Sequence, residues 1–409
     1  MNTTPQNTPF KQTEIGPIPQ DWEVKKLGEV GEFASGTTPR REMNERYFQN
    51  GSIFWVKTMD LNDAEIYDTS EKVTEIALKE TSSLKVFPKD TVLVAMYGGY
   101  NQIGRTGILK ISACVNQALT AIQVNKQVLN PLFLINILNY KVNYWKDVAT
   151  SSRKDPNITS KDVKTFPIPL PPLPEQTAIA TALSDADALI GSLEKLIHKK
   201  RLLKQATMQH LLTPKEDWEV KKLGEIGECI IGLTYSPNDV KESGRLVLRS
   251  SNVQEGVLKY DNNVYVDVKI PEKLIVRKDD ILICVRNGSR DLIGKCALID
   301  DNAVGETFGA FMSVFRSLFN RYVFILFQSS IIKKQIDEHL GATINQITNK
   351  SLNSFEIPFP PLEEQTRIAT ILSDMDAELS GLEGKLEKYR QLKQGMMQQL
   401  LTGKIRLVG

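Results

Sequence analysis

One stretch of this sequence, residues 174–212, constrains the fold more than any other because it predicts a single long helix. After Pro174 it contains no proline, and its apolar residues recur at steps of three and four, which places them on one face of an α-helix. Residues 175–212 would extend about 57 Å at the helical rise, which is longer than a helix inside one domain needs to be. The predicted apolar seam consists of Ile179, Leu183, Ala186, Ile190, Leu193, Ile197 and Leu203.

The chain repeats this helix from Glu363 onward. Matching letters lie 189 positions later, as Glu175 and Glu364 or Leu193 and Leu382 illustrate. Two similar long helices in one chain are expected to pair along a heptad-like seam, as an intramolecular coiled coil. The seam predicted for the second helix consists of Ile368, Leu372, Met375, Leu379, Leu382, Leu386, Leu392 and Leu400.

Both helices also carry adjacent apolar pairs, such as Leu189 with Ile190 and Ile371 with Leu372. These pairs widen the apolar stripe beyond what a two-helix seam covers. Part of the stripe is therefore predicted to bind another protein.

The rest of the chain is duplicated as well. The opening DWEVKKLGEVGE (residues 21–32) returns as DWEVKKLGEIGE (residues 217–228), directly after the first long helix. Each opening leads into a mixed segment with a short apolar run, predicted to be a buried strand, at residues 90–99 and 280–289. A second strand-like run follows each at residues 107–112 and 296–300, and helical patterns follow at residues 131–148 and 320–340.

Each mixed segment closes with a proline-rich stop that precedes its long helix, because proline keeps the approaching chain extended. The order is opening, globule, stop and helix, twice over. This predicts a cyclic pseudo-two-fold arrangement in which the helices are antiparallel, hold the two globules at opposite ends, and the second helix ends near Asp21.

Composition excludes several classes of protein. A chain of 409 residues with 41% hydrophobic and 24% charged residues is typical of a soluble protein with two or more domains. No apolar run reaches membrane-spanning length, and the N-terminus lacks the pattern of a signal peptide. Four cysteines without CxxC spacing and three histidines predict neither disulfides nor a metal site. We therefore expect a metal-free cytoplasmic protein. The net charge of +2 does not indicate which kind of partner the protein binds.

A stiff spacer with two similar but non-identical globules suits duplex DNA, whose major grooves recur about every 34 Å on one face. Several segments resemble those of one known family: the opening WEVKKLGE, SIFWVKTMDL (residues 52–61), VNQALTAI (residues 115–122), the stops PPLPEQ and PPLEEQ, and the helix segments LSDADALI and LSDMDAEL. On these segments the chain resembles the specificity subunit of type I restriction–modification systems. The resemblance covers nearly the whole chain. The sequence departs from the family pattern in its second mixed segment, where GRLVLRSSNVQEG (residues 244–256) lacks the tryptophan found in the first mixed segment.

The resemblance implies an α+β fold in which two mixed α/β target-recognition domains are separated by a pair of long antiparallel helices. Each domain would read half of a bipartite, asymmetric double-stranded DNA site, and the helices would set the gap and bind two methylation subunits. No cofactor is expected in this chain, since S-adenosylmethionine, ATP and Mg would belong to methylation and restriction subunits; whether a restriction subunit joins stays open. The expected parts are a lead-in without regular structure (1–20), domain 1 (21–173), helix 1 (174–213), domain 2 (214–362), helix 2 (363–403) and a tail (404–409).

Aligning the two repeats by their apolar anchors shows which polar positions recur and could contact DNA. A cation followed by short hydrogen-bonding side chains suits phosphate anchoring combined with base reading. The first-domain candidates are Lys57, Thr58, Asp60, Tyr97, Tyr100, Asn101 and Arg105. The second-domain candidates are Arg249, Ser250, Ser251, Asn252, Arg286, Asn287, Arg290 and Lys295.

A plainer interpretation stands beside these candidates. A loop with Gly, Asn and Arg is also typical of a solvated turn, and Trp55 is expected in the core rather than stacked on a base. Arg40 and Arg41 are either a phosphate anchor or an ordinary surface pair.

The sequence gives no sign of a catalytic site of its own. It has no GxxxxGK phosphate loop, and the glycines of residues 98–104 lack the frame of a dinucleotide-binding motif. The ExK spacing at Glu23 and Glu219 is explained by the repeated opening, and the histidines are scattered. Two alternatives remain open: a coiled-coil scaffold that carries two protein-binding modules, and a nuclease or methylase in its own right.

Overall fold

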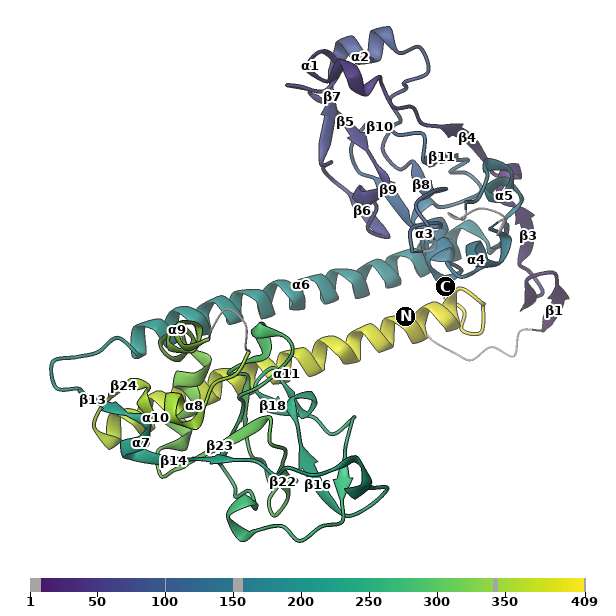
Figure 1. The fold of residues 1–409 in the computed structure, drawn as a ribbon. Coiled ribbons are helices and arrows are strands. Elements are labelled where there is room, and N and C mark those ends of the chain that lie inside the picture. The colour runs from purple at the N-terminus through teal and green to yellow at the C-terminus, as the bar shows by residue number, and fades with distance from the viewer. Residues whose placement is uncertain (1–8, 100, 150–156, 341–344, 408–409) are drawn as a thin grey trace. The chain divides into compact units, whose positions relative to one another are not determined.

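The computed structural model describes residues 9–99, 101–149, 157–340 and 345–407. The chain has the predicted α+β class and divides into two compact units, Met1–Glu194 with Gly384–Gly409 (the first unit) and Lys195–Glu383 (the second unit). Each unit consists of one mixed domain and one half of each long helix (Figure 1). Within the described residues, no helix is both long enough and apolar enough to span a membrane.

Both units contain the same antiparallel sheet. Its order is β4-β11-β8-β9 in the first unit and β14-β23-β20-β21 in the second. The first-unit strands are β4 Gly31–Ser35, β8 Val92–Ala95, β9 Thr106–Leu109 and β11 Leu119–Val124. The second-unit strands are β14 Gly227–Ile231, β20 Ile281–Cys284, β21 Cys296–Leu298 and β23 Met312–Ser317. The four strand-like runs predicted from the sequence are therefore confirmed.

Strand β8 shows why these runs are apolar throughout. Val92 and Val94 face the core that the sheet shares with the helices, whereas Leu93 and Ala95 face a second core on the opposite side. A strand buried on both faces needs apolar side chains at every position. Strand β20 alternates between two cores in the same way.

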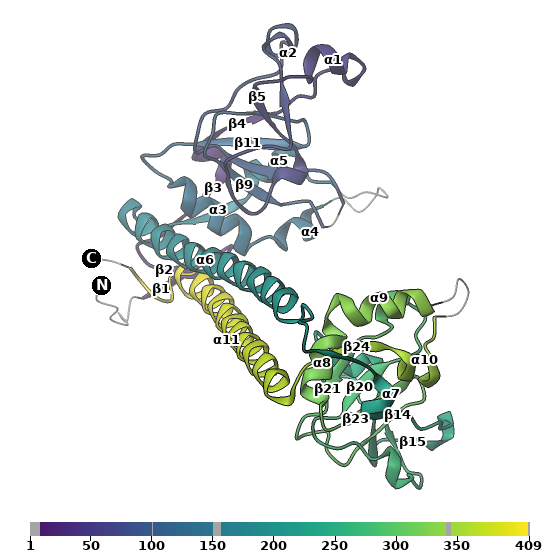
Figure 2. The same ribbon diagram turned by 90° about the vertical axis from the view of Figure 1, so that its left-hand side faces the viewer.

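The helical patterns at residues 131–148 and 320–340 each form two helices rather than one. They are α3 Pro131–Tyr140, α4 Tyr144–Val148, α8 Asn320–Gln328 and α9 Ser330–His339. In the second unit the break lies at Ser329, whose side chain accepts a hydrogen bond from the Ile331 N–H at 3.2 Å and caps α9. Figure 2 shows α3 between the first-unit sheet and the long helix α6, where Phe133 joins the core.

The opening of each repeat pairs with the proline-rich stop of the same repeat as a two-stranded antiparallel sheet. The pairs are β3 (Glu23–Lys26) with β12 (Pro167–Leu170) and β13 (Glu219–Lys222) with β24 (Glu356–Phe359). Proline is tolerated in such an edge strand, where its missing N–H leaves no central ladder unpaired. The short helices beside these pairs are α5 Ser160–Thr165, α7 Leu223–Ile226 and α10 Asn349–Ser354.

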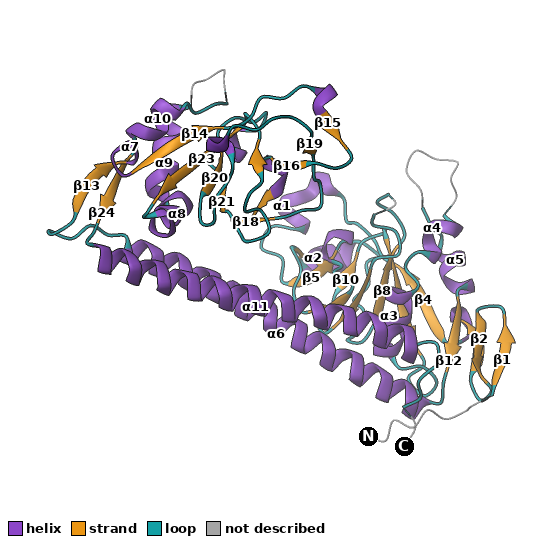
Figure 3. Cartoon of the chain, turned by 90° about the horizontal axis from the view of Figure 1, so that it is seen from below, coloured by secondary structure: helices purple, strands orange, loops and turns teal. Residues whose placement is uncertain are grey.

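The expectation that residues 1–20 lack regular structure is wrong for the part that the structure describes. Strands β1 (Phe10–Thr13) and β2 (Gly16–Pro19) form an antiparallel hairpin, with Gly16 at a φ of 99° in the turn. Figure 3 shows this hairpin, and Ile18 of β2 is buried in the first-unit core. The prediction from composition was wrong here because the tertiary contacts of a few side chains, Ile15, Ile18 and Pro19, anchor this hairpin.

Each unit has a second, smaller group of strands. In the first unit these are β5 (Ile53–Val56), β7 (Glu71–Val73) and β10 (Cys114–Val115), with the short helices α1 (Asn44–Tyr47) and α2 (Glu75–Glu80). Strand β6 (Ala64–Ile66) instead extends the main sheet of this unit, as a parallel neighbour of β9. In the second unit they are β15 Val240–Lys241, β16 Arg245–Leu248, β17 Val253–Gln254, β18 Val257–Leu258, β19 Tyr265–Val266 and β22 Thr307–Phe308. These groups differ between the units, although β5 and β16 occupy matching places and each has a parallel neighbour.

The two long helices are confirmed as α6, Leu173–Leu211, and α11, Leu362–Leu400, each of 39 residues. In the first unit, Glu194 and Asp187 of α6 pair with Arg390 and Lys393 of α11. In the second unit, Lys200 and Lys204 pair with Glu378 and Asp376. Partner numbers fall along α11 as they rise along α6, so the helix halves are antiparallel within each unit.

The buried face of the long helices differs in part from the predicted seam. Leu183, Leu193 and Ile197 are buried, as are Leu372, Leu379 and Leu386. Leu203 and Leu392, however, are 50% and 54% exposed and lie outside the seam. At the three- and four-residue spacing the inward positions are Lys204 and Lys393, whose side chains are only 17% and 24% exposed. The prediction failed here because it followed apolar letters, whereas a lysine stem buries its methylenes and carries its ammonium to an acid at the edge.

The end of each long helix is fixed to the start of the other by an ion pair within one unit. In the first unit the Arg406 guanidinium bonds the Glu175 carboxylate at 2.6 and 2.7 Å and Asp21 at 2.9 and 2.7 Å. In the second unit, Lys215 pairs with Glu364 at 2.7 Å. The second helix thus ends beside Asp21, as the repeat predicts. Hydrogen bonds from Arg367 and Lys215 lower the pKa of Glu364 to about 2.

Candidate nucleic-acid interface

A short 3-10 turn follows strand β5 in the first unit and strand β16 in the second, and it carries several predicted contact residues. We call these the strand-end turns; they comprise residues 57–60 and 249–252. In the first, the Asp60 carboxylate accepts the Lys57 N–H at 2.7 Å. In the second, the Asn252 side-chain oxygen accepts the Arg249 N–H at 3.0 Å. The two turns are therefore closed by the same contact, made by an acid in one unit and an amide in the other.

This contact changes the interpretation of two candidates. Asn252 is fully buried, and its amide also donates to the Lys259 carbonyl at 2.9 Å. Asp60 likewise accepts the Ser70 N–H at 3.0 Å. Both side chains hold the backbone of their turn. Asn252 is fully buried and Thr58 is only 9% exposed in the structure described, so both lie within the turn rather than on its surface. Their contact with DNA stays a prediction that this burial does not favour.

In each unit the loop after the central strand, β8 or β20, contacts the strand-end turn. In the first unit, the Gln102 amide lies 3.6 Å from the sulfur of Met59, which is itself 70% exposed. In the second unit, the Asn287 amide donates to the Ser250 hydroxyl at 3.1 Å. Segments about 40 residues apart in sequence thus form one polar surface in each unit.

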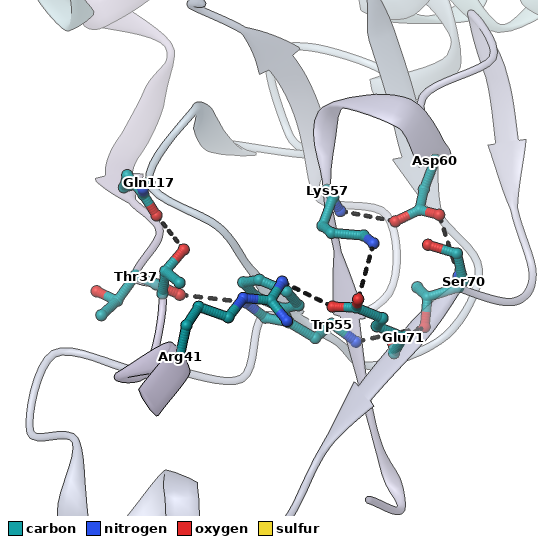
Figure 4. Close-up of polar contacts among 10 residues, drawn as sticks. Thr37, Arg41, Trp55, Lys57, Asp60, Ser70, Glu71 and Gln117 are labelled. Atoms are coloured by element: carbon teal, nitrogen blue, oxygen red, sulfur yellow. Dashed lines mark hydrogen bonds and ion pairs between the residues drawn. The ribbon is translucent and has the colours of Figure 1, made fainter. Parts of the chain in front are cut away.

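The first-unit surface contains two cations that share one carboxylate (Figure 4). Glu71 of β7 accepts a hydrogen bond from Arg41 at 2.8 Å, and its other oxygen lies 3.3 Å from the Lys57 ammonium. The Arg41 guanidinium also lies 4.3 Å from the Phe48 ring centre and 4.9 Å from the Trp55 ring centre. Trp55 is buried, as expected, and donates its indole N–H to the Thr37 carbonyl at 3.1 Å.

The second-unit surface is held differently. Arg249 donates to the Asn262 carbonyl at 3.0 Å, and Arg290 donates to the Asp337 carbonyl at 3.2 Å. The exposed Arg286 lies over the ring of Phe311 at 5.1 Å. Phe311 is 57% exposed, so this stacked pair faces solvent.

The other candidates lie around these surfaces. Tyr97, Asn101 and Ser251 are exposed, whereas Arg105 and Lys295 are half-buried. Tyr100 lies outside the described residues. Sequence reasoning missed Glu71, Gln102 and Phe311, because none of them belongs to a pattern that recurs between the repeats.

The described residues show no candidate metal site. They contain no group of three or more His, Cys, Asp or Glu side chains that could hold a metal ion. Burial raises the pKa of the Cys114 thiol to about 11 and that of Cys296 to about 12, so neither is a thiolate at neutral pH.

Comparison with known proteins gives consistent matches over nearly the whole chain. The family model described as type I restriction modification DNA specificity domain matches residues 19–202 and again residues 215–391. The putative type I restriction enzyme MjaX specificity subunit of Methanocaldococcus jannaschii is 30% identical over 97% of this chain and 97% of its own length. The MjaVIII specificity subunit of the same organism is 26% identical over 97% and 96%. The crystal structure of the type I restriction–modification S subunit from M. genitalium covers 93% of this chain and 96% of its own, at 16% identity and a TM-score of 0.61.

Proposed function

Because this chain belongs to the family of type I restriction–modification specificity subunits, which are non-catalytic, we propose that its two units each read one half of a bipartite, asymmetric DNA site. The observation that carries the proposal is the repeated surface, in which a strand-end turn and the loop after the central strand meet in both units. Cations and short polar side chains converge there, as phosphate anchoring and base reading require. Different side chains on the two surfaces would read different bases.

The long helices would set the gap between the two half-sites. A helix of 39 residues is about 58 Å long, which exceeds the spacing of about 34 Å between successive major grooves on one face of duplex DNA. The ion pairs along α6 and α11 support a stiff pair in each unit.

The same helices would bind two adenine-methyltransferase subunits. Leu189, Leu202, Leu203 and Leu392 remain exposed on the helices although they are apolar, and exposed apolar residues on a helix pair indicate a protein interface. The duplication of the chain supports two copies of one partner. S-adenosylmethionine would then bind to these methyltransferase subunits, and ATP and Mg would bind to restriction subunits that join them. The assembly would act on host DNA in the cytoplasm.

The proposal is tested by reconstituting the full chain with its methylation subunits and sequencing the adenines that the complex methylates. We expect one interrupted, asymmetric target. Exchanging residues 21–173 for the corresponding domain of another family member should change one half of that target and leave the other half as the control. Methylation at unrelated sequences, or a change in both halves, would contradict the proposal.

Gel-shift titrations separate this function from a protein-binding scaffold. Binding through phosphates weakens steeply as salt rises, whereas a scaffold without DNA affinity gives no shifted band at any salt concentration.

A further inference from the structure

Glu71 stands out in the first unit because one carboxylate pairs with two cations of the candidate interface. It lies on β7, where it is the cross-strand neighbour of Trp55 on β5. One oxygen accepts from Arg41 at 2.8 Å and the other lies 3.3 Å from the Lys57 ammonium. The hydrogen bond from Arg41 lowers the pKa of Glu71, so the carboxylate is charged at neutral pH. Two positive charges are thereby partly neutralised before any DNA arrives.

All three side chains can be reached from solvent. The exposed fractions are 47% for Arg41, 25% for Lys57 and 36% for Glu71. An exposed ion pair of this kind contributes only about 0–1 kcal/mol to folding. A DNA phosphate can therefore replace the carboxylate at little cost to the fold.

Arg41 does not depend on Glu71 for its position. Its guanidinium lies over the rings of Phe48 and Trp55, at 4.3 and 4.9 Å from their centres. Both rings belong to the small core of this lobe, and a guanidinium over an aromatic face is held by the ring quadrupole. Removing the carboxylate would thus leave a positioned, unpaired cation rather than a disordered one.

The part of the second unit that the structure describes has no such carboxylate at its matching surface. Among the described residues, Arg249 donates to a main-chain carbonyl and Arg286 lies over Phe311, and neither forms an ion pair with an acid. The two candidate interfaces therefore differ in charge, although their turns and loops correspond. Within the residues that the structure describes, a carboxylate pairs with the cations of the first interface alone.

We propose that Glu71 is a specificity-determining residue, which withholds Arg41 and Lys57 from DNA until base contacts at the first half-site favour their release. The inference rests on the proposed function. On unrelated DNA only phosphate attraction is available, and Glu71 competes with it. At the cognate half-site, base contacts contribute the additional free energy that moves the two cations from the carboxylate to phosphates.

The variant Glu71→Gln tests this role, because it keeps the shape of the side chain and removes its charge. The full chain, assembled with its methylation subunits, is titrated with a random-sequence duplex and with the duplex identified by methylation sequencing, at several salt concentrations. Two released cations should steepen the plot of log affinity against log salt by about 1.8 for random DNA, at about 0.9 per phosphate contact. The slope for the cognate duplex should stay unchanged, so the ratio of specific to non-specific affinity falls.

Glu80→Gln is the matched control. Glu80 lies in the same lobe and accepts from Arg46 at 2.9 Å, so its replacement makes the same change in net charge at an exposed ion pair. We expect it to leave both slopes as in the wild type. The double variant Arg41→Ala with Glu71→Gln should lose about half of the added slope, which assigns that part to Arg41.

The outcomes separate the two proposals. A wild-type complex that binds both duplexes equally overturns the proposed function. A wild type that discriminates, combined with a Glu71→Gln variant whose random-DNA slope is unchanged, overturns the role of Glu71 alone. Equal steepening on both duplexes, or the same result with Glu80→Gln, also overturns it, because general charge would then explain the effect.

Discussion

At the scale of single residues, the polar side chains of the two strand-end turns have two different roles. Asp60 and Asn252 close the turns by accepting main-chain N–H groups, and Asn252 does so without any exposed surface. Ser251, the neighbour of Asn252, is exposed. The same short run of letters therefore contains one residue that builds the surface and one that is free to contact a ligand.

This difference predicts unequal effects of two neighbouring substitutions on stability. Asn252→Ala removes the acceptor for the Arg249 N–H and leaves that N–H without a partner inside the turn. The free energy of unfolding should therefore fall by about 1–3 kcal/mol. Ser251→Ala should change it by less than about 0.5 kcal/mol. Thermal or urea unfolding of the two variants measures this directly. Equal stabilities would show that the Asn252 amide does not hold the turn.

At the scale of elements, the seam of the long helices is apolar as far as Ile197 in α6 and Leu386 in α11, and farther along each helix it includes an inward lysine, Lys204 or Lys393. Leu193 is 6% exposed, whereas Lys204 occupies an inward position and reaches Asp376. An inward lysine with an acid partner weakens a coiled coil but favours one register over others. The seam therefore combines residues that give stability with residues that give alignment.

Aspartate substitutions distinguish the seam from the exposed face. Leu193→Asp buries a charge without a partner and should destabilise the chain by roughly 3 kcal/mol or more. Leu203→Asp, on the same helix but 50% exposed, should change the free energy of unfolding by less than about 0.5 kcal/mol. It should instead weaken binding of the methylation subunits if this face is their interface. Denaturant unfolding and co-purification measure the two effects, and a stable Leu193→Asp protein would contradict the assignment of the seam.

The stability that the first unit gains from the ion pairs of Arg406 with Glu175 and Asp21 should depend on pH. Arg406→Met leaves the buried Glu175 without its cation, which should cost about 3–5 kcal/mol at neutral pH. A hydrogen bond from Arg406 lowers the pKa of Asp21, so that contribution is present above the unfolded pKa of about 3.9 and is lost as pH falls through the lower folded value. The difference between wild type and variant should therefore shrink below about pH 4. Arg390→Met, at an exposed pair with Glu194, is the control and should cost under about 1 kcal/mol.

At the scale of the whole molecule, the proposed function gives the long helices the role of a spacer that sets the distance between two half-sites. Inserting one heptad into α6 and one into the matching place in α11 keeps the seam in phase and adds about 10.5 Å. The gap between methylated half-sites should then lengthen by about three base pairs, at 3.4 Å per pair. Methylation sequencing measures the gap. An unchanged gap would mean that the helices do not set the spacing.

The sequence by itself determined the architecture that repeats. Heptad spacing, proline stops and the doubled opening are local patterns, and a pattern that depends on neighbouring residues can be read without coordinates. The two long helices, the buried strands β8 and β20, and the family all followed from such patterns. The residues in the strand-end turns were found in the same way, because they recur between the repeats.

Only the tertiary structure decided which of those residues are available and what surrounds them. Arg41 meets Glu71, and Arg406 meets Glu175 at a separation of 231 positions, without any periodic signal in either segment. The burial of Asn252, the exposure of Leu203 and the hairpin β1–β2 are also set by contacts between distant segments. Such contacts depend on how packed elements approach one another in space, and a list of letters does not contain that geometry.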